Sequence, residues 1–340
     1  MRLANKIGVL NLCGLLLIGN TEACTRFTYT GSDNKVITAR SMDWVEDMRT
    51  DLWAFPAGMI RQSHTAENGV VWTSQYGSVI ASGYDMGATD GLNTQGLAAN
   101  ILYLASSDYG PVQPARKNLS VIDWAQYALD HYATVNEAVQ DLSQDQFNLI
   151  APALPNGMLP TVHLSLTDRN GDNAIFEYEQ GKLKVYHGKT YTVMTNEPSY
   201  DKQLALNQYW QNLKGAFLPG TSEPSDRFVR ASYYLSIAPQ AVTEKEAVAI
   251  AFSIIRNASA PIGVNVPGRP NVAATFWRSA ADLKEGVYYF ENTDRPNVFW
   301  VELKKLDLNK GASPQRLLLK HDEVYAGDAS HKFVKTKPIF

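Results

Sequence analysis

The residue in this sequence best placed to do chemistry is Cys24, because it follows a segment typical of a cleaved secretion signal. A short basic start and an apolar run over residues 7–18 precede a polar tail, in which Thr21 and Ala23 supply the small residues that signal peptidase requires at −3 and −1. The apolar run is shorter than the ~20 residues that a membrane-spanning helix needs. We therefore expect residues 1–23 to be a signal peptide and Cys24 to become the first residue of the mature chain.

An N-terminal cysteine carries a thiol and a free α-amino group on one residue. The amine has an ordinary pKa of ~7.7–8.0, so near neutral pH a useful fraction is unprotonated and can take the thiol's proton, directly or through a water. Cys24 would then supply both nucleophile and base, as a single-residue counterpart of a Cys–His pair.

Other interpretations of Cys24 remain open. It could be an ordinary buried cysteine, or the lipidated cysteine of a non-catalytic binding protein, although a lipoprotein signal has an apolar residue where this chain has Thr21. A papain-like enzyme would pair Cys24 with a histidine and would stay active with extra residues before the cysteine. The 6 histidines show no His-x-x-x-His pair and no carboxylate-flanked spacing, so we expect no metal and no other cofactor.

The length of the chain fits one large domain or two small ones. Removing residues 1–23 from the 340-residue chain changes the net charge from −3 to −4, which does not favour nucleic acid or an anionic membrane as a partner. No linker divides the rest, so we expect a single domain over residues 24–340. Because Cys13 lies in the signal, the mature chain would hold one cysteine in an oxidising compartment. We expect a periplasmic or secreted protein with a small-molecule substrate and leave a homo-oligomer open.

Strand-like alternation surrounds Cys24. Residues 26–30 and 36–40 alternate on either side of a turn at 31–34, which predicts a β-hairpin. This hairpin would bring residues 40–43 back beside the cysteine.

The rest of the chain alternates groups of strands with groups of helices. We expect strands near Trp72 and at residues 78–82, 96–104, 161–168, 173–178, 183–187, 190–195, 273–278, 286–290 and 298–303, with turns at 83–85, 90–91 and 168–171. We expect helices at 121–133, at 138–142 after a capping box that opens at Thr134, from about Ser225 to Leu235, and from a capping box at Thr243 to Asn257, with a loop at 258–272. This order favours an α+β domain of two antiparallel sheets packed face to face with helices outside. The βαβ alternation of a doubly wound fold is absent from the sequence.

Four short motifs resemble those of one known family. They are Cys24-Thr25, Ala39-Arg40-Ser41-Met42-Asp43-Trp44, Thr195-Asn196-Glu197-Pro198 and Ser225-Asp226-Arg227-Phe228-Val229-Arg230. Together they look like the choloylglycine hydrolases, the family that contains penicillin V acylases and conjugated bile acid hydrolases, and most like its secreted Gram-negative branch. The resemblance covers nearly all of the mature chain. It implies an N-terminal-nucleophile amidase with a four-layer αββα sandwich.

The resemblance also implies roles for individual residues. Cys24 matches the nucleophile, and Arg40 matches an arginine that lies against the thiol, where a cation lowers a thiol pKa. Asp43 matches the carboxylate that holds the α-amine by a charge-assisted hydrogen bond. Asn196 matches the side-chain amide of the oxyanion hole. Arg227 matches an arginine at a helix start near the site.

Three residues are expected to contact substrate: Met42, Trp44 and Tyr103. Position 103 divides the branches, since bile acid hydrolases of the Gram-positive type have Asn there and the penicillin V acylase type has Tyr. An aromatic wall suits a phenoxyacetyl ring or a fatty acyl chain. We therefore expect hydrolysis of the amide between an apolar acyl group and a small polar amine, as in penicillin V or an N-acyl homoserine lactone. Hydrolysis of conjugated bile acids is the alternative.

Overall fold

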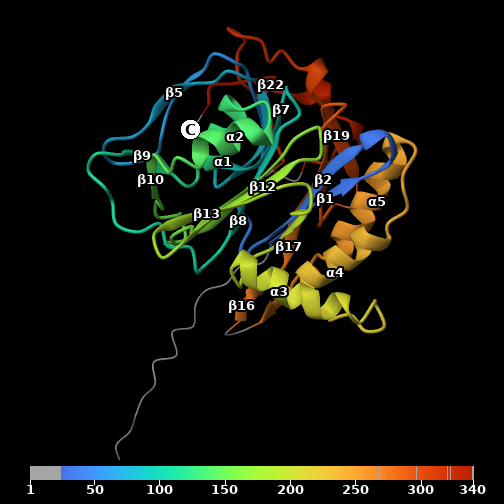
Figure 1. The fold of residues 1–340 in the computed structure, drawn as a ribbon. Helices are drawn as coiled ribbons and strands as arrows, with labels where there is room; N and C mark the ends of the chain where they lie inside the picture. Colours follow the sequence, from blue (N-terminus) through green and yellow to red (C-terminus); the bar gives the residue numbers. More distant parts are fainter. Residues whose placement is uncertain (1–23, 267–268, 296, 320, 322, 339–340) are drawn as a thin grey trace, which may run out of the picture.

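Two large β-sheets form the centre of the molecule. The computed structural model describes residues 24–266, 269–295, 297–319, 321 and 323–338 (Figure 1). Sheet A has 7 strands in the order β14 (Val193–Met194), β1 (Cys24–Thr30), β2 (Val36–Asp43), β17 (Thr275–Asp282), β18 (Val287–Asn292), β19 (Val298–Glu302) and β21 (Gly327–Asp328). Sheet B has 9 strands in the order β13 (Lys182–His187), β12 (Asn173–Glu179), β11 (Val162–Thr167), β8 (Ala98–Tyr103), β7 (Gly87–Asn93), β6 (Ser78–Gly83), β3 (Leu52–Phe55), β20 (Gln315–Leu317) and β22 (Val334–Lys335).

Smaller elements complete the strand inventory of the described residues. Three two-stranded pairs form from β4 (Ile60–Gln62) with β5 (Val71–Thr73), β9 (Lys117–Ser120) with β10 (Phe147–Ile150), and β15 (Asn265–Val266) with β16 (Arg269–Ala273). Short 3₁₀ helices span Ser32–Asn34, Leu303–Lys305 and Ser330–Lys332.

Helices cover the outer face of each sheet. On sheet B, α1 (Trp124–His131) packs on β7 and β8, and α2 (Val135–Leu142) packs on β12; on sheet A, α4 (Pro224–Ile237) packs on β1 and α5 (Glu244–Asn257) on β2 and β17. A further helix, α3 (Tyr200–Gln211), packs on α4 (Figure 1). This is the predicted four-layer αββα sandwich.

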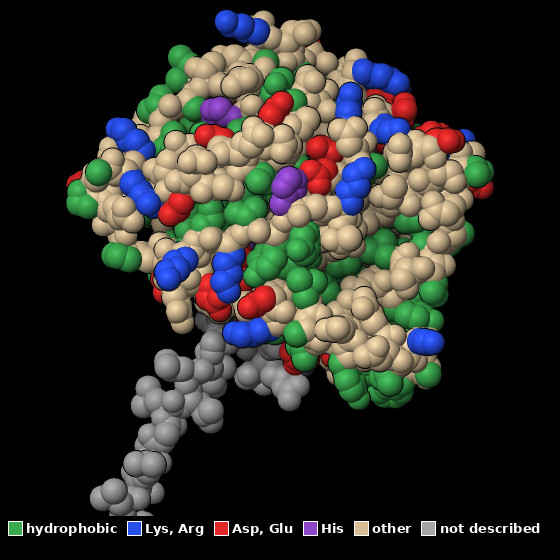
Figure 2. Space-filling model, viewed as in Figure 1, with side chains coloured by type: hydrophobic (Ala, Val, Ile, Leu, Met, Phe, Trp, Pro, Cys, Tyr) green, Lys and Arg blue, Asp and Glu red, His purple; other side chains and the backbone are tan. Residues whose placement is uncertain are grey.

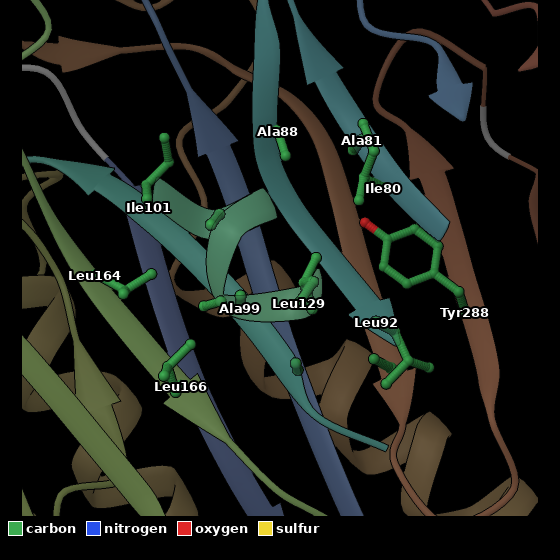
Figure 3. Close-up of a cluster of buried hydrophobic side chains, with 14 of the residues drawn as sticks. Ile80, Ala81, Ala88, Leu92, Ala99, Ile101, Leu129, Leu164, Leu166 and Tyr288 are labelled. Carbon is green, nitrogen blue, oxygen red and sulfur yellow. The ribbon is translucent and has the colours of Figure 1, made fainter. Parts of the chain in front are cut away.

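The hydrophobic core includes buried side chains of both sheets and of the helices that cover them. Figure 3 shows Leu129 of α1 beside apolar side chains of β6, β7, β8 and β11, while Tyr288 extends from β18 of sheet A. Gly91 lies under α1 because a side chain there would meet Ile80 and Leu129 at 2.7 Å. Between the sheets the packing is partly polar: Asp90 of β7 accepts a hydrogen bond from Ser279 of β17.

The hairpin and the two capping boxes predicted from the sequence are confirmed. Strands β1 and β2 form the predicted hairpin, with Cys24 opposite Met42. Thr134 and Thr243 both form complete capping boxes, which satisfy amide groups that the first helical turn leaves unpaired.

Two predictions about elements are wrong, and helix α3 was missed. Helix α3 was not predicted because its buried residues are Tyr200, Gln203 and Asn207. They recur at the spacing of one helix face, but two of the three are polar, so the sequence shows little apolar periodicity there. The predicted turn at 90–91 lies inside β7, where small and polar residues serve packing under α1 and between the sheets. The predicted loop at 258–272 contains β15 and most of β16.

Candidate active site

Four chain segments bring the predicted site residues together. Cys24 opens β1 and Asp43 closes the neighbouring strand β2. Asn196 follows β14, the strand on the other side of β1, and Arg227 lies in the first turn of α4, which packs on β1. Arg40 lies on β2. The predicted catalytic residues therefore converge at one end of sheet A.

The thiol of Cys24 is buried between polar groups and the side chain of Met42. Its Sγ lies 3.6 Å from Arg40 Nη2, 3.7 Å from the carbonyl oxygen of Asp43 and 3.9 Å from Met42 Sδ. Burial raises the pKa of the Cys24 thiol, and the charge of Arg40 opposes this rise. Arg40 thus acts in the predicted direction, but desolvation outweighs it.

Arg40 is held by groups that the sequence did not reveal. Its Nη1 donates to the carbonyl oxygen of Thr89 on β7, and its guanidinium lies 5.2 Å from the ring centroid of Trp277 on β17. A cation over an indole ring is an attractive arrangement. These partners come from opposite sheets, so only the strand register places them around Arg40.

The backbone nitrogen of Cys24 is hydrogen-bonded to the side chain of Asn196. In the 340-residue chain this nitrogen is a peptide N–H, and it donates to Asn196 Oδ1 at 2.6 Å. The partner predicted for this nitrogen is Asp43, which accepts a hydrogen bond from Thr275 Oγ1 at 2.5 Å and lies 3.8 Å from Arg227 Nη1. Burial raises the pKa of the Asp43 carboxyl, and Arg227 opposes that rise. The hydrogen bond between Asp43 and a free amine stays a prediction.

Arg227 links the start of β1 to Asn196. It is fully buried, donates from Nη1 to the carbonyl oxygen of Cys24 at 2.5 Å and to Thr25 Oγ1 at 2.6 Å, and donates from Nη2 to Asn196 Oδ1 at 3.0 Å. Burial lowers the pKa of Arg227, with Asp43 acting against this. The guanidinium therefore fixes the backbone of Cys24 and the Asn196 side chain relative to each other.

Asn196 is also tied to sheet B. Its Nδ2 donates to the carbonyl oxygen of Tyr103 at 2.6 Å. The adjacent residue Glu197 accepts hydrogen bonds through Oε1 from the backbone nitrogens of Ala105 and Ser106. These contacts join the segment after β14 to the segment after β8.

A buried histidine contacts the backbone of the segment that carries Asn196. His163 Nε2 lies 2.8 Å from the carbonyl oxygen of Thr195, and its Nδ1 lies 3.1 Å from Glu177 Oε2. Neither residue was predicted as part of the site. Among the described residues, none of the hydrogen-bond partners recorded for Cys24 is a histidine, so the arrangement does not support a papain-like pair.

The three predicted substrate contacts line one apolar cavity with the thiol. Met42, Trp44 and Tyr103 share this acyl cavity with Cys24 and Arg40. Its other apolar walls come from Met48, Tyr84, Met86, Ile101, Ile122, Leu154, Pro160 and Val162. The rings of Trp44 and Tyr103 meet edge to face at 5.9 Å. The cavity volume is about 50 Å³, which is space for a few water molecules.

Comparisons with known proteins agree with this architecture. The family model described as "Linear amide C-N hydrolases, choloylglycine hydrolase family" matches residues 24–315. A penicillin V acylase of Pectobacterium atrosepticum is 44% identical over 365 residues, covering 99% of this chain and 97% of that protein. A solved structure of a penicillin V acylase from Agrobacterium tumefaciens superposes with a TM-score of 0.87 at 48% identity, over 93% of this chain and 98% of the other.

Bile acid hydrolases are more distant. A conjugated bile acid hydrolase variant from Clostridium perfringens superposes with a TM-score of 0.74 at 20% identity, over 89% of this chain and 99% of the other, which establishes a shared fold. A bile salt hydrolase/transferase of Lactiplantibacillus plantarum is 24% identical over 63% of this chain and 72% of its own length.

The architecture is therefore that of the N-terminal-nucleophile hydrolases. This chain belongs to the choloylglycine hydrolase family of linear amide C–N hydrolases.

Proposed function

We propose that this protein is a penicillin V acylase-like amidase whose nucleophile is the thiol of an N-terminal Cys24. Removal of residues 1–23 would turn the Cys24 nitrogen into an amine that serves as the base. The observation that carries the proposal is the position of the thiol, which lies in the wall of an apolar cavity beside Arg40. The Asn196 side chain lies beside the backbone nitrogen of Cys24.

In the proposed reaction the amine takes the thiol's proton, and the sulfur attacks the carbonyl carbon of the amide. The negative charge on the carbonyl oxygen would be stabilised by Asn196 Nδ2 and the backbone N–H of Tyr103. The amine product leaves with the proton held by the α-ammonium, and a thioester to Cys24 remains. Water then attacks the thioester carbonyl and gives a proton to the α-amine. The carbon–sulfur bond breaks, the acid is released, and the α-ammonium returns the proton to the Cys24 thiolate.

The acyl cavity supports an apolar acyl group. Its walls are formed by aromatic rings, aliphatic side chains and methionines, and it contains few polar groups. The hydroxyls of a bile acid would need partners there, and an unpaired buried polar group costs ~1–3 kcal/mol. The relatives at 44% and 48% identity carry the name penicillin V acylase, whereas those named for bile acids are far less similar. We therefore favour a phenoxyacetyl or fatty acyl group.

Residues 1–23 are proposed to be a signal peptide, which would make the mature protein periplasmic or secreted and leave residues 24–340 as one domain. The match to the family model begins at residue 24. No helix among the residues described in the structure is long and apolar enough to cross a bilayer. The lipid-anchored alternative fits poorly, because the Cys24 side chain is buried against Arg40 and Met42 and leaves no exposed sulfur for a lipid.

Self-association is proposed through α3 and the loop that follows it. Tyr209 and Phe217 are 64% and 67% exposed there, and Figure 2 shows apolar side chains gathered on the part of this face where that segment lies in Figure 1. Light scattering on the wild type and on a Tyr209→Ser, Phe217→Ser variant tests this. A larger mass that falls in the variant supports the proposal, and a wild-type monomer contradicts it.

The function is tested by measuring kcat/KM of the mature protein on penicillin V, a long-chain N-acyl homoserine lactone and glycocholate. We expect the first two to be cleaved faster than glycocholate, and we expect Cys24→Ala to cleave none of them. Turnover by Cys24→Ala at the wild-type rate would contradict the proposed nucleophile.

A further inference from the structure

Three segments that form the acyl cavity meet at one hydroxyl group, that of Tyr84. Trp44 Nε1 donates to Tyr84 Oη at 2.8 Å, and Asn156 Nδ2 donates to it at 3.2 Å. The Tyr84 hydroxyl in turn donates to Glu46 Oε1 at 2.7 Å. A phenol can donate one hydrogen bond and accept others at its oxygen, so the Tyr84 hydroxyl can form all three bonds at once.

Each of these segments supplies walls of the cavity. The segment after β2 contributes Trp44 and Met48, and the segment between β10 and β11 contributes Leu154 and Pro160. The turn between β6 and β7 contributes Tyr84 itself. The hydroxyl therefore joins the three cavity walls to one another, outside the catalytic groups.

The turn that carries Tyr84 is itself firmly positioned. Tyr84 N donates to the carbonyl oxygen of Met48 at 2.8 Å, and Met86 N donates to the carbonyl oxygen of Gly83 at 2.9 Å. Arg316 Nη2 forms an ion pair with Asp85 at 3.1 Å. Tyr84 is thus a fixed point to which the two longer segments attach.

The cavity is too small for the groups it is proposed to bind. Its volume of about 50 Å³ is far below the ~300 Å³ at which ligand pockets begin. An acyl group can enter only if wall side chains change rotamer or whole wall segments move apart. Met42, Met48 and Met86 can change rotamer, since methionine is unbranched and flexible, but moving whole segments apart stretches or breaks the bonds at Tyr84.

We propose that the Tyr84 hydroxyl is a specificity-determining latch that limits the width of the acyl cavity. This inference rests on the proposed function, because it takes the cavity to be the acyl site. A narrow group such as phenoxyacetyl would fit with small side-chain movements. A wider group would require the three segments to separate and would break more of the hydrogen bonds at the Tyr84 hydroxyl.

Tyr84→Phe removes the shared oxygen and keeps the ring, and Glu46→Gln is the matched control because its amide oxygen can still accept from Tyr84. The substrates are penicillin V and the 2-naphthyloxyacetyl amide of the same amine, which adds one fused ring to the acyl group. We expect Tyr84→Phe to raise the ratio of kcat/KM for the wide over the narrow substrate about fivefold. Glu46→Gln should leave the ratio within about twofold of wild type.

A binding measurement tests the latch independently of amide hydrolysis. Titration calorimetry of phenoxyacetate and 2-naphthyloxyacetate into Cys24→Ala, with and without Tyr84→Phe, requires no turnover. The preference should shift towards the wider acid by the same factor, even if amide hydrolysis itself failed. An unchanged ratio, an equal change in Glu46→Gln, or no binding of either acid would overturn the latch. If Tyr84→Phe lost its thermal unfolding transition, Glu46→Ala and Asn156→Ala, both at exposed positions, would be used instead and should shift the ratio in the same direction.

Discussion

Asn196 accepts the hydrogen bond of the Cys24 nitrogen at 2.6 Å, while its own amide nitrogen donates to Tyr103. One side chain therefore holds the proposed base with its oxygen and faces the proposed oxyanion position with its nitrogen. Arg227 fixes the choice of which end faces Cys24, because its guanidinium also donates to Asn196 Oδ1. The proposed nucleophile and the proposed oxyanion hole are thus coupled through Asn196.

Asn196→Ala should lower kcat by roughly 10²–10³, the loss seen when one oxyanion donor is removed. KM should change much less, since the acyl cavity does not include this residue. Steady-state kinetics on penicillin V provides the measurement, with Asn212→Ala, at an exposed position after α3, as the control. A variant with wild-type kcat would exclude the proposed role.

Arg40→Ala should make the thiol less reactive at a given pH. Burial already raises the pKa of the Cys24 thiol, and Arg40 is the charge that opposes this. Removing Arg40 raises the thiol pKa further, so the thiolate fraction at pH 7 falls and alkylation by iodoacetamide slows. The rate plotted against pH should shift to higher pH, whereas Arg169→Ala, an exposed arginine in the β11–β12 turn, should not shift it. An unchanged profile in Arg40→Ala would remove Arg40 from the account.

Asp43→Asn should affect turnover more than alkylation. The carboxylate is proposed to orient the amine, and Thr275 and Arg227 hold it in place. Its loss should therefore reduce kcat by at least tenfold, because the base is no longer positioned. The iodoacetamide rate should fall much less. Equal losses in both assays would mean that Asp43 acts on the thiol and not on the amine.

Penicillin V should be cleaved better than penicillin G and glycocholate. The two penicillins differ in the acyl group, where penicillin G lacks the ether oxygen and presents a shorter phenylacetyl group to Trp44 and Tyr103. Buried hydroxyls of glycocholate would lack partners in the acyl cavity, a cost that corresponds to roughly ten- to a hundredfold in affinity. A larger kcat/KM for glycocholate than for penicillin V would reverse this ranking and leave the Cys24 mechanism standing.

Much of this structure could be predicted because its signals are local. The β1–β2 hairpin follows from alternation about a turn, and the two capping boxes are short sequence patterns. The structure places Asn196, which its sequence motif singled out, in contact with Cys24. Helix α3 could not be found in the same way, since Gln203 and Asn207 occupy positions where an amphipathic helix has apolar residues.

The contacts around the site could not be predicted because they depend on how two sheets register. Thr89 and Trp277 meet Arg40 from different sheets, and no sequence spacing relates them. Thr275 reaches Asp43 where β17 slips by one residue against β2. The net rise in the Cys24 pKa likewise needs the burial of the thiol, which the neighbouring charge alone does not indicate.

The central claim is that catalysis requires a free amine on Cys24. In the uncleaved chain the Cys24 nitrogen is a peptide nitrogen and cannot accept a proton from the thiol. The most direct test combines N-terminal mass analysis with penicillin V hydrolysis, for protein that starts at Cys24 and for protein that keeps one extra residue before it. The protein that starts at Cys24 should turn over substrate, and the extended form should be nearly inert while still folded by circular dichroism. Full activity in the extended form would contradict the mechanism.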